Sequence, residues 1–454
     1  MAEIIKRKKA LSVSPLKSSA PIGASLAFAG INRSMPMMHG SQGCTAFGKV
    51  FFVRHFREPI PLQTTAMDQV STVLGADESI IEGLKTIAEK NKPALIGVPT
   101  TGLSETQGCD VHGSIKEFYK RYPEYTSIKV VGVNTPDFTG SMESGFAAAL
   151  HAMIDKLVPA RADAGTSPGK RKKQVNILAS SMLTPGDLEV IKEYVECFGL
   201  RPLVVPDIGD SLDGHLGTDH LSPLTIGGTS VSEFETMGDA VASISIGNSV
   251  KKAGDLLESR TEVKNYHFDQ LLMLEDIDKL VALLSQLSHK AVPERLRRQR
   301  SQLQDAMLDC HFMLGFSSFA IAADPDLLYS FSCLVNSVGG SVAVAVAPTK
   351  APILQHVFAD TVKIGDLEDM EKMAKEKTVD MVLGNSHAVA SSQRMNVPIL
   401  RIGFPQYDLI GGYQRTWIGY RGVRQALFDL ANIMSSLEKG EIEPYVSKYA
   451  QKMD

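Results

Sequence analysis

Strand-like and helix-like segments alternate along most of the chain, and this alternation constrains its fold more than any other feature. Residues 319–323 are typical of a short buried strand, and Asp324-Pro325-Asp326 then opens a helix that ends at Gly339-Gly340. A valine-rich strand follows from Ser341 to Val346. The pattern continues with strands at 361–364, 379–383 and 397–402 and with helices from about 367 and after 385. Such alternation is typical of parallel βαβ units in a doubly wound sheet.

The middle and the beginning of the chain follow the same pattern. Val175–Ala179 is strand-like, and Thr184-Pro185-Gly186-Asp187 carries the signals of a helix start: a threonine N-cap, a proline in the first position and an acid in the first turn. Further strands are predicted at 203–205 and 240–246. In the first third we expect strands near 35–38, 94–98 and 129–133 and a helix near 46–53.

The predicted fold class is α/β, with three Rossmann-like domains whose parallel sheets are flanked by helices, plus a C-terminal helical tail. Residues 1–158 form the first domain, 174–292 the second, 293–422 the third and 423–454 the tail. The segment 159–173 is polar, rich in glycine and proline and without periodicity, so it is predicted to be a linker.

Composition excludes several classes of function. A formal net charge of −4 over 454 residues gives no sign of a nucleic-acid partner. The charged N-terminus is followed by Pro15 and serines rather than by an apolar segment, which argues against a secretory signal. No apolar run approaches the roughly 18 residues of a membrane-spanning helix. We therefore expect a soluble, cytoplasmic protein with no membrane or nucleic-acid partner.

The cysteines point to isolated ligands rather than to a self-sufficient metal site. Five cysteines lie far apart and none belongs to a CxxC pair: Cys44, Cys109, Cys197, Cys310 and Cys333. This spacing is neither a disulfide framework nor a zinc or ferredoxin motif. Any metal chemistry must use ligands that the fold or another chain brings together. Cys109, Cys197, Cys310 and Cys333 are more typical of small core residues than of ligands.

The most informative segment is His39-Gly-Ser-Gln-Gly-Cys44. It follows a predicted strand and precedes a predicted helix, where α/β sheets place ligand-binding groups. Gly40 and Gly43 are expected to allow positive φ and a close approach of the backbone to a bulky inorganic group. A thiolate near a helix N-terminus is favoured electrostatically. Taken alone, the segment also fits a buried structural cysteine in a tight turn.

Other polar turns carry weaker signals. No Gly-x-Gly-x-x-Gly or phosphate-binding Gly-x-x-x-x-Gly-Lys-Ser/Thr motif is present, so nucleotide binding is unsupported. Residues 100–105, which include Gly102 and Glu105, follow a strand end. This segment either contributes polar groups to a site or is a capped loop from which Ser104 starts a helix.

The segments His39–Cys44 and Phe51–Pro59 resemble the nitrogenase molybdenum–iron protein β-chain family, within the nitrogenase component 1 α/β-chain family. The likeness runs along nearly the whole chain. It includes Leu303–His311, Ala323–Asp326, Leu383–Asn385 and Ile402–Pro405. The resemblance implies that Cys44 is a cluster ligand.

Within that family, the closer likeness is to the β-type subunits of scaffolds that assemble the iron–molybdenum cofactor. The segments that carry this likeness are Pro61–Gln69, Thr100–Cys109, Asn134–Phe138 and Phe404–Asp408. By this resemblance the chain is a scaffold subunit for assembly and maturation of that cofactor rather than a catalytic subunit.

The departures from the catalytic β-chain concern its cluster ligands. That chain supplies three cysteines to an eight-iron cluster, and the matching positions here are Ser19, Cys44 and Gly102. Glycine offers no side-chain ligand and serine is a poor substitute for a thiolate on iron. One cysteine cannot hold a cluster that needs about four ligands.

The resemblance therefore implies a [4Fe–4S] cluster shared through Cys44 with a NifE-like α-type subunit that supplies three cysteines. It also implies an α2β2 heterotetramer on which the nitrogenase iron protein docks transiently. The iron–molybdenum cofactor precursor is expected on the partner, so no residue here is assigned to it. Two other functions stay open: the β-subunit of a nitrogenase or protochlorophyllide-reductase-type enzyme, and a three-domain small-molecule binding protein without metal.

Overall fold

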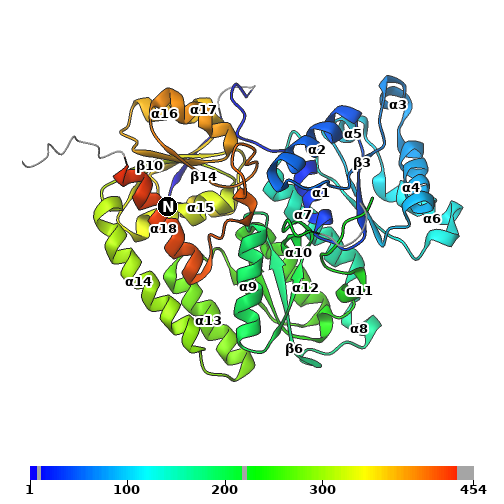
Figure 1. Ribbon diagram of the computed structural model, residues 1–454. Helices are drawn as coiled ribbons and strands as arrows, with labels where there is room; N and C mark the ends of the chain where they lie inside the picture. Colours follow the sequence, from blue (N-terminus) through cyan, green and yellow to red (C-terminus); the bar gives the residue numbers. More distant parts are fainter. Residues whose placement is uncertain (8–11, 217–221, 437–454) are drawn as a thin grey trace, which may run out of the picture.

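Three parallel sheets, each flanked by helices, make up the molecule (Figure 1). The computed structural model describes residues 1–7, 12–216 and 222–436. Every strand pair in these residues is parallel. The predicted α/β fold class with Rossmann-like sheets is therefore confirmed. None of the helices in the described residues is long and apolar enough to cross a membrane.

The first sheet has the strand order β3-β2-β4-β5 and lies at the upper right in Figure 1. Its strands are β2 (Ser34–Met38), β3 (Gln63–Thr64), β4 (Leu95–Pro99) and β5 (Lys129–Val133). Its helices are α1 (Ala20–Ala29), α2 (Gln42–Phe56), α3 (Gln69–Leu74), α4 (Asp77–Asn91), α5 (Gly102–Gln107), α6 (Val111–Arg121), η1 (Pro123–Tyr125), α7 (Met142–Leu157) and α8 (Arg161–Ala164).

Helices α1 and α7 pack backbone to backbone because glycine faces the partner helix on each side. A Cβ on Gly23 would lie 1.8 Å from the carbonyl oxygen of Met142, and one on Gly145 would lie 1.9 Å from that of Ala20. Both distances are far below van der Waals contact. This contact fixes the start of α1, and with it Ser19, against the start of α7.

The second sheet has the order β7-β6-β8-β9 and lies at the bottom in Figure 1. Its strands are β6 (Arg171–Ala179), β7 (Arg201–Val205), β8 (Ala240–Ile246) and β9 (Asn265–Phe268). Its helices are α9 (Pro185–Cys197), α10 (Ile208–Ser211), α11 (Val231–Phe234), η2 (Met237–Asp239), η3 (Asn248–Val250), α12 (Lys251–Thr261) and α13 (Leu274–Ser288). The predicted start of α9 is confirmed, since Thr184 accepts a hydrogen bond from Asp187 N–H at 3.0 Å.

The third sheet has the order β1-β12-β11-β10-β13-β14 and lies at the upper left in Figure 1. Its strands are β1 (Glu3–Ile5), β10 (Ser318–Ala322), β11 (Ser341–Ala347), β12 (Thr361–Ile364), β13 (Met381–Gly384) and β14 (Ile399–Arg401). Its helices are α14 (Glu294–Leu314), α15 (Pro325–Ser337), η4 (Pro352–His356), α16 (Leu367–Lys375), η5 (Ser386–Ala388), α17 (Val389–Met395), η6 (Gly412–Gln414) and α18 (Gly419–Ser435).

Three details differ from the predicted division of the chain. The first residues form β1, which pairs with β12 of the third sheet, so the segment 1–158 is not confined to one sheet. The predicted linker 159–173 contains α8 and the first residues of β6. The predicted tail begins inside α18, and its last residues, 437–454, lie outside the described residues.

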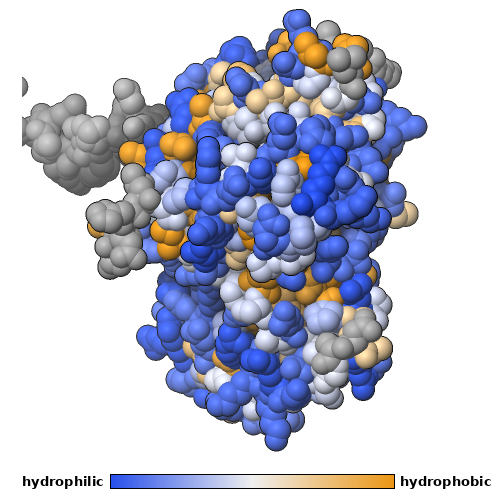
Figure 2. Space-filling model, turned by 90° about the vertical axis from the view of Figure 1, so that its right-hand side faces the viewer, coloured by the Kyte–Doolittle hydropathy of each residue, from blue (hydrophilic) through white to orange (hydrophobic). Residues whose placement is uncertain are grey.

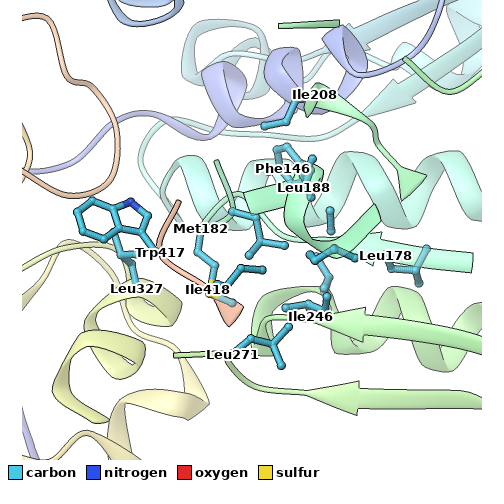
Figure 3. Packing of buried hydrophobic residues seen from close by; sticks show 14 of the residues in the cluster. Phe146, Leu178, Met182, Leu188, Ile208, Ile246, Leu271, Leu327, Trp417 and Ile418 are labelled. Carbon is cyan, nitrogen blue, oxygen red and sulfur yellow. The ribbon is translucent and has the colours of Figure 1, made fainter. Parts of the chain in front are cut away.

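Buried side chains from the three sheets meet in one core, part of which Figure 3 shows. Phe146 of α7, Leu178 of β6, Ile246 of β8 and Trp417 before α18 are each at most 2% exposed. Full burial of such side chains stabilises the fold by roughly 1.5–3 kcal/mol each. The core therefore joins the three sheets into one packed body.

Candidate cluster-ligand site

Cys44 lies in the first turn of α2, directly after the turn that follows β2. The helix begins at Gln42 rather than near Ala46, so Cys44 is a helical residue and not part of the preceding loop. Its side chain is half-buried, and its Sγ lies 3.5 Å from Ser41 Oγ. The helix dipole gives this position a positive potential, which suits an anionic group bound there.

The two glycines of this turn act differently from the prediction. Neither Gly40 nor Gly43 has a positive φ. Gly40 is required for space, because a Cβ there would lie 2.4 Å from Thr101 Oγ1. A Cβ on Gly43 would meet only Ser41 Oγ, at 3.9 Å. The backbone next to Cys44 is therefore exposed and open to a bulky group.

His39 fixes the turn that precedes Cys44. Its carbonyl oxygen accepts hydrogen bonds from Thr101 N–H at 3.1 Å and from Ser104 Oγ at 3.0 Å. Its Nδ1 lies 2.9 Å from Thr65 Oγ1. Burial lowers the pKa of His39 to about 4, so the ring is neutral at pH 7. The sequence pattern gave no signal for this role.

The segment around Gly102 lies beside this turn, at the carboxyl end of β4. Thr101 caps α5, so the capped-loop interpretation is confirmed, although the helix begins at Gly102 rather than at Ser104. Gly102 N–H donates to Asp137 Oδ2 at 3.1 Å. Glu105 accepts a hydrogen bond from Thr100 Oγ1.

Ser19 is connected to the same place through Lys17. Lys17 Nζ donates to the carbonyl oxygen of Asp137 at 2.7 Å, and Ser19 is the N-cap residue of α1. The segments that carry Ser19 and Gly102 are therefore both tied to Asp137. Sequence reasoning missed both contacts: Lys17 belongs to no motif, and the segment Asn134–Phe138 carried the family likeness without indicating a contact of Asp137.

Exposed apolar side chains surround the Cys44 helix. Phe47, Val50 and Val53 of α2 are 68%, 49% and 43% exposed. Val70 and Val73 of α3 are exposed as well. Figure 2 shows the face that carries α3 and α6, where hydrophobic side chains gather at the upper end of a mostly hydrophilic surface. Large exposed apolar side chains around one helix are typical of a protein interface.

The other four cysteines differ in burial. Cys310 and Cys333 are buried, as predicted, and burial raises the pKa of Cys333 to about 12. Cys109 and Cys197 are half-buried rather than core residues, and burial raises the pKa of Cys109 to about 11. A raised thiol pKa disfavours the thiolate that iron requires.

The donor set of this chain fits one ligand of an iron–sulfur cluster and not a complete site. Cys44 presents a thiol beside open backbone, whereas Ser19 and Gly102 offer a hydroxyl and no side chain. Among residues 1–7, 12–216 and 222–436, no group of three or more His, Cys, Asp or Glu side chains is placed to hold a metal ion. A cluster bound here would need its other ligands from another chain.

Comparison with known proteins agrees with this geometry. The family described as nitrogenase component 1 type oxidoreductase matches residues 19–435. The nitrogenase iron-molybdenum cofactor biosynthesis protein NifN of Klebsiella pneumoniae is 43% identical over 434 residues, covering 96% of this chain and 93% of that protein. The NifN protein of a Nostoc species is 42% identical over 446 residues, covering 98% of both chains.

A solved structure shares the whole architecture. The structure of nitrogenase Cp1 at pH 6.5 superposes with a TM-score of 0.89 at 26% sequence identity, covering 97% of both chains. The chain therefore belongs to the nitrogenase component 1 family and, within it, to the NifN proteins of iron–molybdenum cofactor biosynthesis.

Proposed function

We propose that this chain is the β-type subunit of a scaffold on which the nitrogenase iron–molybdenum cofactor is assembled and matured. In this proposal Cys44 supplies one ligand to a [4Fe–4S] cluster, and a NifE-like α-type subunit supplies the others. The precursor of the cofactor is held by the partner. The single observation that carries the proposal is a lone half-buried thiol in the first turn of an exposed helix.

The surroundings of Cys44 support a shared site. Phe47 lies about one turn further along the same helix, so a partner that covers it would also cover the thiol. When bound, a [4Fe–4S] cluster supplies one-electron transfer. In this proposal, the chain binds one iron atom through Cys44 and excludes water from its own side of the cluster.

A second exposed apolar surface supports the α2β2 assembly. Leu308 and Phe312 of α14 are 69% and 85% exposed, and Phe316 just beyond the helix is fully exposed. In Figure 1, α14 lies on the left side of the molecule, away from α3 and α6. One surface therefore serves the α-type partner and the other a second copy of the αβ pair. Transient docking of the iron protein belongs to the same proposal.

The alternative function, a catalytic nitrogenase β-subunit, is favoured by the likeness to nitrogenase Cp1. The residues Ser19 and Gly102 weigh against it, because thiols are missing at two of the three positions that the family resemblance matches to ligands. The relatives with more than 40% identity carry the name of a biosynthesis protein.

The test is a Cys44→Ala substitution in the complex, co-expressed with its α-type partner and purified without oxygen. We expect the variant to lose one four-iron cluster, about four iron atoms per αβ pair, together with its EPR signal. Cys333→Ala is the matched control, since it removes a buried thiol and is expected to keep the iron. Parental iron content in a folded Cys44→Ala complex would contradict the proposal.

The purified chain alone gives an independent measurement. With one suitable thiolate, it is expected to bind little iron after anaerobic reconstitution with iron and sulfide. A stoichiometric four-iron cluster on the isolated chain would mean that the ligands are not shared.

A further inference from the structure

Buried carboxylates meet where the three sheets come together. Glu143 lies in the first turn of α7, and Asp326 lies in the first turn of α15; they are 4% and 1% exposed. Asp326 N–H donates to Glu143 Oε2 at 2.8 Å. Ser249, in η3 after the second sheet, donates to Asp326 Oδ2 from its N–H at 3.0 Å and from its Oγ at 2.6 Å. These contacts link the first, second and third sheets at one point.

Two unpartnered oxygens point to a proton at this place. Asp326 Oδ1 and Ser180 Oγ are buried, and neither has a hydrogen-bond partner in the described residues. Ser180 follows β6 and is 1% exposed. Its Oγ and Asp326 Oδ2 lie 2.3 Å and 2.8 Å from the position that a Cβ on Gly247 would occupy, so both converge on that glycine. Asp324 Oδ1 is a second buried carboxyl oxygen without a hydrogen-bond donor in the described residues, and a carboxyl with such an oxygen is better tolerated when it is neutral.

Few cations face this cluster. Lys17 lies beside Asp324, the N-cap of α15, and Arg7 lies beside Lys17. From the second sheet, His267 and Asp269 face Asp326, and they form a pair with an Nε2 to Oδ1 distance of 2.9 Å.

Three ionised carboxylates could not all be neutralised by these groups, and unpaired buried charge is strongly unfavourable. Burial raises the pKa of Asp324 and of Asp326 to about 6. Burial and the neighbouring aspartates raise the pKa of Glu143 well above its usual value.

We infer that Glu143, Asp324 and Asp326 form a proton-dependent latch, which holds the three sheets together when protonated and loosens their junction when the protons leave. Lys17 lies beside Asp324 of the latch, and Lys17 Nζ and Gly102 N–H both donate to Asp137, so the latch borders the segments that carry Ser19 and Gly102. It goes beyond the proposed function, because it stands on residues that hold no cluster.

The direction of the pH dependence follows from the pKa shifts. Each carboxyl has a higher pKa in the folded chain than in the unfolded chain, where values near 4 apply. The stability that the latch contributes is therefore fully present below pH 4 and is lost as the pH rises through about 6. Burial also raises the pKa of Asp187, a separate buried acid, to about 6. Its contribution to stability falls with rising pH in the same way, so only a local measurement isolates the latch.

The experiment is hydrogen–deuterium exchange of the full chain between pH 5.5 and 8.5, with rates corrected for the intrinsic effect of pH. Peptides that contain Glu143, Ser249 and Asp326 are expected to lose protection by at least about tenfold as the pH rises. In the double variant Glu143→Gln with Asp326→Asn, which keeps the accepting oxygens and leaves Asp324 as the only titrating member of the latch, protection of these peptides is expected to depend much less on pH than in the parent.

Controls and the single variants complete the design. Asp187→Asn is the matched control, in which the junction peptides keep the parental pH dependence. Each single variant, Glu143→Gln or Asp326→Asn, is expected to remove part of that pH dependence. The single variants test the proposal if the double variant fails to fold. Equal protection at all pH values in the parent, or parental pH dependence in both single variants, overturns the latch. The readout needs no iron, so its failure is distinct from failure of the cluster proposal.

Discussion

Gly102 decides how many iron ligands this chain can offer. Its backbone does not require glycine, because its φ is not positive. A Cβ at this position would lie 3.3 Å from Asp137 Cβ, so the neighbouring side chain must move by only a few tenths of an ångström. Ser19, the other departure, makes no side-chain cap to α1, so its hydroxyl is not needed for the helix.

These geometries lead to a prediction for the double variant Ser19→Cys with Gly102→Cys. In the anaerobic complex with its α-type partner, it is expected to bind more iron than the parent or to show an altered EPR spectrum, because thiolates replace a hydroxyl and a hydrogen. It is not expected to reduce dinitrogen. The control is Ser19→Ala with Gly102→Ala, which fills the same space without sulfur. If the cysteine variant keeps the parental iron and spectrum, cavity shape or the partner limits cluster size.

At the residue scale, the sequence located the candidate ligand but not its environment. The strand–turn–helix pattern around Cys44 placed it correctly, since hydrophobic periodicity is a local property. The positive φ predicted for Gly40 was wrong. Glycine is needed there because the side chain of Thr101, which is distant in sequence, leaves no room for a Cβ. His39, Lys17 and Asp137 were missed for the same reason: their partners are set by tertiary packing.

The α1–α7 pair is the element whose packing bears most directly on the site. Both helices present glycine at the crossing, and α1 begins directly after Ser19. A methyl group at either glycine would overlap a backbone carbonyl, which cannot rotate away as a side chain can. Separation of the helices would move both Ser19 and Glu143.

We therefore expect Gly23→Ala to destabilise the iron-free chain by about 3 kcal/mol or more, at the upper end of the usual cost of overpacking. Gly145→Ala is expected to act similarly. The measurement is thermal or urea unfolding followed by circular dichroism. Gly43→Ala is the matched control, because the added Cβ there meets only Ser41 Oγ at 3.9 Å. A parental unfolding midpoint in Gly23→Ala would show that the helices can separate freely.

Most helices and strands were predictable from the sequence, and the two strands that were missed in whole or in part lack a local hydrophobic pattern. The strand Thr361–Ile364 was predicted with its observed bounds, since the alternation of apolar and polar residues is a local signal. Strand β1 was missed because Glu3–Ile5 has no alternating pattern of its own and forms only by pairing with β12. The start of β6 was missed because Arg171 to Lys173 are exposed and charged.

At the scale of the whole molecule, the two apolar surfaces make different predictions about assembly. The surface around Cys44 is the proposed contact with the α-type partner, whereas Leu308, Phe312 and Phe316 lie on the separate α14 surface. The sequence did not reveal the α14 surface. Which face of α14 is exposed depends on how α18 and α13 pack against its other faces.

In the proposed α2β2 assembly, Phe312→Asp is expected to yield αβ heterodimers with the same iron content per αβ pair as the parent. A charge at the centre of an apolar contact costs roughly 2 kcal/mol or more, so the dissociation constant between dimers should rise about thirtyfold. Light scattering after size-exclusion chromatography measures the mass. Phe358→Asp, which alters a 47% exposed side chain elsewhere, is the control. Loss of iron without loss of the tetramer would mean that the α14 surface contacts the α-type partner rather than a second αβ pair.

Strand β1 has a consequence for how the chain is made. Residues Glu3–Ile5 pair with Thr361–Lys363, which leave the ribosome only after most of the chain has been translated. At about 5–20 residues per second, the first strand waits roughly 20 to 70 s for its neighbour. During that interval β1 has no neighbouring strand to pair with, while the first and second sheets can already fold. A nascent chain with its amino end still free is thus the form that cellular chaperones would meet.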